Sequence, residues 1–117
     1  MKIHNTIELN QALKLFDRII KSKSVMPILS NIQITLSDDY FTFKGTDLQQ
    51  SVIYTCWTTD FKRDNHANFD TTVNYKLFKD IIKGKESIDI SYADTYLTID
   101  GSKLNCVSAD EYPTLST

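Results

Sequence analysis

The chain has 117 residues, of which 41% are hydrophobic and 24% charged, and this size and composition are typical of one globular domain. No apolar run approaches the roughly 20 residues of a membrane-spanning helix, and the N-terminal residues lack the basic and then apolar segments of a signal peptide. We therefore expect a cytoplasmic protein without a membrane partner. Two cysteines, Cys56 and Cys106, are too few for a disulfide framework and lack the spacing of a metal site, so we expect two free, buried thiols.

The first half of the chain is predicted to contain one helix among four strands. Apolar side chains at helical spacing predict an amphipathic helix over residues 7–21, with Asn5 or Thr6 as its N-cap. The helix is expected to end within residues 22–26, ahead of Pro27. Alternation of apolar and polar residues predicts the strands, which cover residues 2–5, 28–36, 41–44 and 51–58.

The second half is predicted to repeat this order of elements. A polar loop over residues 59–65 precedes a strand over residues 68–73. A helix follows over residues 74–83, and Gly84 is its expected C-cap. Three short strands come last, over residues 87–92, 96–100 and 103–107. Both halves therefore have the order β-α-β-β-β, and we expect an α+β fold in which a duplicated unit packs two helices on an antiparallel sheet.

Both predicted helices carry basic residues three or four positions apart on the face opposite their apolar residues. These residues, with those that directly follow each helix, are Lys14, Arg18, Lys21, Lys23, Lys76, Lys79, Lys83 and Lys85. Residues 9–23 and residues 74–85 each carry a net charge of +3, which leaves −8 for the rest of a chain whose total is −2. Lysines on one helix are often only solubilising, but two matched stripes on an acidic chain favour contact with a polyanion backbone without base reading.

A catalytic or metal site is not predicted. His4 and His66 are isolated, and no nucleophile is paired with a base. Asp47 lies in a turn without the glycines of a phosphate-binding loop, so we expect it to cap backbone amides. We therefore expect no enzymatic activity, no metal and no cofactor.

Four short motifs stand in order along the chain. They are Pro27-Ile28-Leu29-Ser30-Asn31, Gly45-Thr46-Asp47-Leu48, Thr71-Thr72-Val73 leading into Asp80-Ile81, and Glu111-Tyr112-Pro113. In order and spacing, these motifs resemble the first domain of the bacterial sliding clamp, the beta subunit of DNA polymerase III, over essentially the whole chain. The resemblance implies a DNA clamp fold, with residues 1–117 as a single clamp domain. It also implies a processivity factor that forms a ring around duplex DNA with other clamp domains or subunits.

The resemblance further implies roles for particular residues. The two basic stripes would form the wall of the ring that faces DNA, and the implied DNA-binding residues are Lys14, Arg18, Lys21, Lys23, Lys76, Lys79 and Lys83. Flexible lysines suit this role because they attract phosphates without fixing a register. An edge strand would meet another subunit through Lys103, Leu104, Asn105, Cys106 and Val107.

The length of the chain departs from this family. Clamp subunits contain three such domains, and the groove that takes peptides of polymerases and clamp loaders lies in the later ones. This chain would therefore reach a polymerase or clamp loader only through domains that it lacks. Both an excised domain and a complete small protein fit the sequence. The alternative function is a free-standing interaction module that binds a replication protein through the expected edge strand at residues 103–107.

Overall fold

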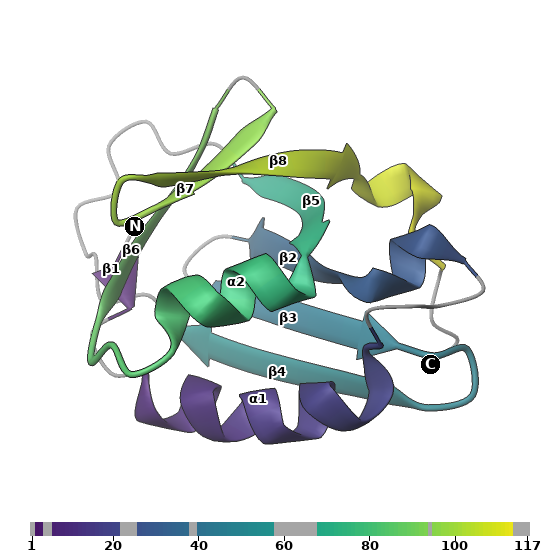
Figure 1. The fold of residues 1–117 in the computed structure, drawn as a ribbon. Helices are drawn as coiled ribbons and strands as arrows, with labels where there is room; N and C mark the ends of the chain where they lie inside the picture. Colours follow the sequence, from purple (N-terminus) through teal and green to yellow (C-terminus); the bar gives the residue numbers. More distant parts are fainter. Residues whose placement is uncertain are drawn as a thin grey trace.

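The computed structural model describes residues 2–3, 6–21, 26–37, 40–57, 68–93 and 95–113. Its elements are, in chain order, β1 (Lys2–Ile3), α1 (Ile7–Ile19), η1 (Pro27–Ser30), β2 (Asn31–Ser37), β3 (Tyr40–Thr46), β4 (Ser51–Trp57), β5 (Phe69–Asn74), α2 (Tyr75–Ile82), β6 (Ile88–Ala93), β7 (Tyr96–Ile99), β8 (Ser102–Ser108) and η2 (Ala109–Glu111). The elements η1 and η2 are short 3-10 helices. The other elements confirm the predicted duplication, with β1-α1-β2-β3-β4 followed by β5-α2-β6-β7-β8 (Figure 1).

The strands form one antiparallel sheet in the order β1-β6-β7-β8-β5-β2-β3-β4. Within each half, the last three strands form a meander of hydrogen-bonded neighbours. The first strand of each half pairs with the second strand of the other half, because β1 pairs with β6 and β5 pairs with β2. Each half thus contributes a strand to the other, and the two halves share one sheet.

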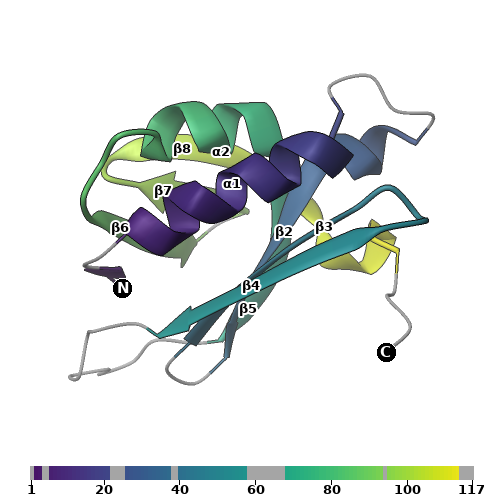
Figure 2. The same ribbon diagram turned by 90° about the horizontal axis from the view of Figure 1, so that it is seen from below.

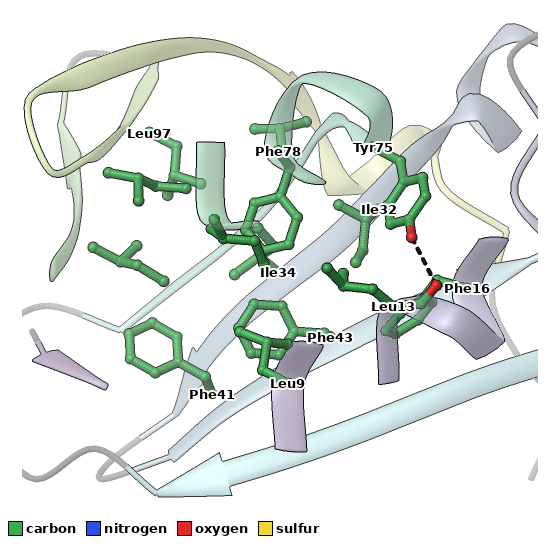
Figure 3. Close-up of a cluster of buried hydrophobic side chains, with 14 of the residues drawn as sticks. Leu9, Leu13, Phe16, Ile32, Ile34, Phe41, Phe43, Tyr75, Phe78 and Leu97 are labelled. Carbon is green, nitrogen blue, oxygen red and sulfur yellow. Dashed lines mark hydrogen bonds between the residues drawn. The ribbon is translucent and has the colours of Figure 1, made fainter. Parts of the chain in front are cut away.

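The helices α1 and α2 lie side by side on one face of the sheet (Figures 1 and 2). Their buried residues are Leu9, Ala12, Leu13, Phe16 and Ile19 in α1, and Tyr75, Phe78 and Ile82 in α2. Phe78 and Phe43 of β3 are fully buried with their ring centroids 5.8 Å apart (Figure 3). Burial of this apolar face leaves the basic face of each helix in solvent. No helix in the described part of the chain is long and apolar enough to cross a membrane.

The helix ends follow local side-chain chemistry. Asn74 caps α2, because its Oδ1 accepts a hydrogen bond from a backbone amide of the first turn at 3.1 Å. Gly84, just beyond α2, takes the φ of +79° that the predicted C-cap glycine requires. Thr6 is the N-cap of α1, but its hydroxyl donates to the Lys85 carbonyl and does not cap the helix. The alternative cap, Asn5, lies outside the described residues.

The strand predicted to start at residue 28 begins later. Residues 27–30 form η1, and β2 begins at Asn31. Pro27 stands at the start of η1, where the amide hydrogen that it lacks is not needed. The Leu29 amide donates to the Met26 carbonyl at 2.9 Å, so this segment closes on itself before the chain enters the sheet.

Strand β8 is internal, and the prediction of an edge strand over residues 103–107 is wrong. The first part of β8 pairs with β7, where Leu104 lies opposite Leu97. The second part pairs with β5, where Val107 lies opposite Thr72. Strands β7 and β5 lie on opposite sides of β8, so residues 102–105 pair on one side and residues 106–108 pair on the other. The terminal strands of the described sheet are β1 and β4.

Candidate nucleic-acid interface

The two helices run antiparallel, which brings the two predicted basic stripes together. At the start of α1, the Thr6 amide donates to the Glu86 carbonyl at 3.1 Å, just beyond the end of α2. Near the end of α1, the Asp17 carboxylate accepts a hydrogen bond from Tyr75, the first residue of α2. The start of each helix therefore lies beside the end of the other, as Figure 2 also shows.

Two surface hollows lie between the helices, and basic residues from both stripes line each of them. These residues are Lys21, Lys76 and Lys79 in the first hollow, and Lys14, Lys83 and Lys85 in the second. Arg18 is exposed on α1 between the two hollows, one turn from both Lys14 and Lys21. The structure thus joins the two stripes into one surface, whereas Lys23 lies outside the described residues.

An acidic residue interrupts this basic surface. Asp17 of α1 forms an ion pair with Lys79 of α2, whose Nζ lies 2.9 Å from Oδ2 and 3.0 Å from Oδ1. The Tyr75 hydroxyl donates its proton to Asp17 Oδ1 at 2.6 Å, and the Leu13 carbonyl oxygen lies 2.9 Å from the same hydroxyl oxygen. Figure 3 shows Tyr75 reaching from α2 toward the backbone of α1 at Leu13. This cluster is the polar link between the two helices.

The charges in this cluster are set by burial and by its hydrogen bonds. Burial raises the pKa of Asp17, but the hydrogen bonds from Tyr75 and Lys79 outweigh it, and the pKa lies below the ordinary value of 3.8. Burial, and then the hydrogen bond to Asp17, raise the pKa of Tyr75 well above its ordinary value of 10.0. At neutral pH the tyrosine is therefore a donor and the carboxylate is charged.

Five basic residues of this surface have no ion-pair partner among the described residues. They are Lys14, Arg18, Lys21, Lys76 and Lys83, all of them exposed, and we name them the helix wall. Lys79 and Lys85 are not part of the helix wall because each forms an ion pair. Lys79 pairs with Asp17, and Lys85 Nζ lies 3.0 Å from Asp100 Oδ2. The sequence patterns did not indicate either ion pair, since the partners lie on different elements. The helix wall presents positive charge that a phosphate backbone can approach without first breaking an ion pair.

Some residues of the predicted subunit interface on β8 are exposed to solvent, and others are buried in the core. Lys103, Asn105 and Val107 are exposed, and Lys103 Nζ lies 5.6 Å from the centre of the Tyr96 ring. Leu104 is 6% exposed and packs in the core, so it is not available to a partner. Cys106 is half-buried and, like Cys56, is a free thiol. The role of the exposed residues in subunit contact stays a prediction.

Asp47, which was also considered as a chemical site, has a structural role. Asp47 caps two backbone amides as predicted, since its Oδ1 accepts from Gln49 at 2.9 Å and from Gln50 at 2.6 Å. Those two hydrogen bonds lower the pKa of Asp47. Within the described residues, no three His, Cys, Asp or Glu side chains cluster as metal ligands would. His4 and His66 lie outside these residues.

Comparison with known proteins gives the family. The family described as DNA polymerase III beta subunit, N-terminal domain, matches residues 1–116. Among solved structures, the chain is similar to the sliding clamp of Bacillus subtilis, with 22% identity and a TM-score of 0.81 over 99% of this chain. It is similar to the Helicobacter pylori beta clamp bound to a DNA ligase peptide, with 25% identity and a TM-score of 0.81 over 100% of this chain. It is also similar to the Pseudomonas aeruginosa sliding clamp bound to griselimycin, with 21% identity and a TM-score of 0.81 over 100%.

The chain spans about a third of the length of these clamps, covering 33%, 33% and 32% of the respective chains. A search of curated proteins finds no significant match. The match of the family to almost the whole sequence, together with the shared fold, identifies the chain as a member of the family of DNA polymerase III beta subunit N-terminal domains.

Proposed function

We propose that residues 1–117 form one domain of a sliding clamp, a non-catalytic processivity factor for a DNA polymerase, and that the helix wall faces duplex DNA. One observation carries this proposal. Antiparallel packing of α1 and α2 gathers five basic residues that form no ion pair with any described residue, on a chain whose net charge is −2. Such a surface attracts the phosphates of any DNA sequence, because the backbone charge is the same at every base pair.

The chemistry of the helix wall suits DNA that slides. Four of its five members are lysines, whose ammonium groups sit on flexible stems and do not hold a phosphate in a fixed bidentate geometry. Each contact is therefore readily exchanged for one with the next phosphate. Topological enclosure, rather than tight binding, would keep the protein on DNA.

Enclosure requires more clamp domains than this chain contains. The clamps that it matches are about three times as long, so other clamp domains or subunits would complete the ring. The Helicobacter pylori clamp is described as bound to a DNA ligase peptide. In the proposed function, other domains make the contacts with a polymerase or clamp loader, and the assembly works in the cytoplasm.

Charge reversal tests the DNA-facing role. Anisotropy of a labelled duplex should give a slope of log affinity on log salt of roughly −4 to −5 if about five phosphates are neutralised. Lys83→Glu should weaken binding and flatten this slope by about 1 or more. Lys44→Glu is the matched control, because Lys44 precedes Gly45, which faces α1, and therefore points to the opposite face of the sheet. Equal losses in the two variants, or binding that is selective for sequence and insensitive to salt, would contradict the proposal.

A second candidate function is a protein-interaction module that uses an edge strand. The observation in its favour is β4, a terminal strand on which Ile53 is 52% exposed and Trp57 is 69% exposed. Terminal strands can add a strand of a partner through backbone hydrogen bonds. Thr55→Pro in β4 should then abolish a complex with a clamp of the same organism in analytical ultracentrifugation, while Lys83→Glu should leave it intact.

A further inference from the structure

We propose that Asp17 restrains the DNA affinity of the helix wall by holding Lys79 in an ion pair, an inference that rests on the proposed DNA-facing role of this surface. The Lys79 ammonium contacts both carboxylate oxygens, at 2.9 and 3.0 Å. The two side chains are 39% and 31% exposed, for Asp17 and Lys79 respectively, so DNA that approaches the helices meets them as a pair. A DNA phosphate can bind Lys79 only by displacing the Asp17 carboxylate, which already contacts it.

Tyr75 keeps the carboxylate in position. The Tyr75 side chain is 5% exposed, and its hydroxyl lies 2.6 Å from Asp17 Oδ1. An exposed ion pair is usually weak, because holding the carboxylate and the lysine in one geometry costs side-chain conformational entropy. Here Asp17 has a second, buried partner, so it stays beside Lys79 when other anions compete.

The negative charge also acts beyond Lys79. Lys83 of the helix wall interacts electrostatically with Asp17 and contributes to its lowered pKa. Asp17 therefore neutralises one cation by contact and reduces the attraction of a second one for phosphate. Both effects lower DNA affinity without removing a lysine, which suits a surface on which DNA has to slide.

Asp80 offers a matched comparison on the other helix. It is exposed on α2, and among the described residues it forms no ion pair. Asp17 and Asp80 are the acidic residues within the two basic segments, residues 9–23 and 74–85. Replacing either one by asparagine removes the same charge, but only Asp17→Asn releases a lysine. Asparagine also keeps an oxygen that can accept the hydrogen bond from Tyr75.

The test measures duplex affinity against salt concentration for the wild type, Asp17→Asn and Asp80→Asn. Asp17→Asn should raise affinity at low salt several-fold and steepen the slope by about 1, because Lys79 becomes an additional phosphate contact. Asp80→Asn should leave the slope unchanged. Identical slopes in the two variants would overturn the inference, since Asp17 would then act only as one more negative charge.

A second pair of variants tests the same inference with Asp17 in place. Lys79→Gln should leave the slope of the wild type unchanged, whereas Lys76→Gln should flatten it by about 1. Equal flattening by both changes would show that Lys79 already contacts phosphate, and the inference would fail. If Lys83→Glu weakens DNA binding but Asp17→Asn does not strengthen it, this inference alone is wrong. If neither Lys83→Glu nor Asp17→Asn changes DNA binding, both this inference and the proposed function are wrong.

Discussion

Gly45 of β3 lies directly against Ile20, at the end of α1. A Cβ atom on Gly45 would lie 2.6 Å from Ile20 Cδ1, closer than two carbon atoms can approach, and 2.9 Å from Phe16 Cδ1. The absence of a side chain at Gly45 thus lets the last turn of α1 pack closely on the sheet. Because α1 carries part of the helix wall, this contact also sets how that surface is presented.

Gly45→Ala is expected to destabilise the protein. The added methyl group overpacks the contact with Ile20 and Phe16, which typically costs about 1–3 kcal/mol. Urea unfolding followed by circular dichroism measures the loss. Ile20→Val removes Cδ1, so the double variant should lose less stability than the two single changes together. An unchanged midpoint for Gly45→Ala would show that α1 does not pack on β3 as described.

Phe78→Ala is expected to cost about 3–5 kcal/mol, because Phe78 is fully buried and its removal leaves a cavity beside Phe43. Leu77→Ala, at the adjacent position, should change stability by no more than about 0.5 kcal/mol, since Leu77 is 53% exposed. Thermal and urea unfolding of both variants give the comparison. Similar losses of stability in the two variants would show that α2 does not bury the face described here.

The contribution of Asp17 to stability is expected to depend on pH. Burial raises its pKa, but the hydrogen bonds from Tyr75 and Lys79 outweigh this, and the pKa in the folded protein is below 3.8. A carboxyl group whose pKa is lowered by folding stabilises the fold above its unfolded pKa and loses this contribution as pH falls through the folded pKa. Asp17→Asn should therefore destabilise the protein more at about pH 7 than at about pH 3. Equal effects at both pH values would mean that the charge of Asp17 does not stabilise the fold.

Cys56 is expected to react slowly with alkylating reagents. Burial, followed by the charge of Glu8, raises its pKa to about 11 from the ordinary value of 9.0. The reactive thiolate is then scarcer by a factor on the order of 100 at about pH 8. Iodoacetamide labelling followed by mass spectrometry of the peptides should show this protection, and urea should remove it. Rapid labelling of Cys56 in the folded protein would contradict its half-buried position on β4.

Local patterns predicted those features that depend on neighbouring residues. The apolar repeat placed α1 over residues 7–21 and α2 over residues 74–83, within two residues of the observed helices, because one face of each helix is buried. The expected end of α1 within residues 22–26 was wrong, since the helix ends at Ile19 and Ile20 is already extended. The turn chemistry of Asp47 was predicted for the same reason, since its bonds join residues two and three positions apart.

The pairing of β8 was not predictable in this way. Alternation along a strand indicates which side chains are buried, but it carries no information on which strand lies beside it. Val107 lies opposite Thr72, which is 35 positions earlier in the chain. Only the assembled sheet identifies that partner and moves the free edge to β4.

The order of elements, the apolar face of each helix and the basic stripe opposite that face all follow from local patterns of residues. The contact between the two stripes, and the ion pair that holds Lys79 to Asp17, follow only from the packing of the helices on the sheet. These two side chains are 62 positions apart, and no local backbone preference acts over that separation. Their contact arises because the apolar faces of both helices are buried on the same face of one sheet. The resulting antiparallel packing places the polar faces of the helices side by side.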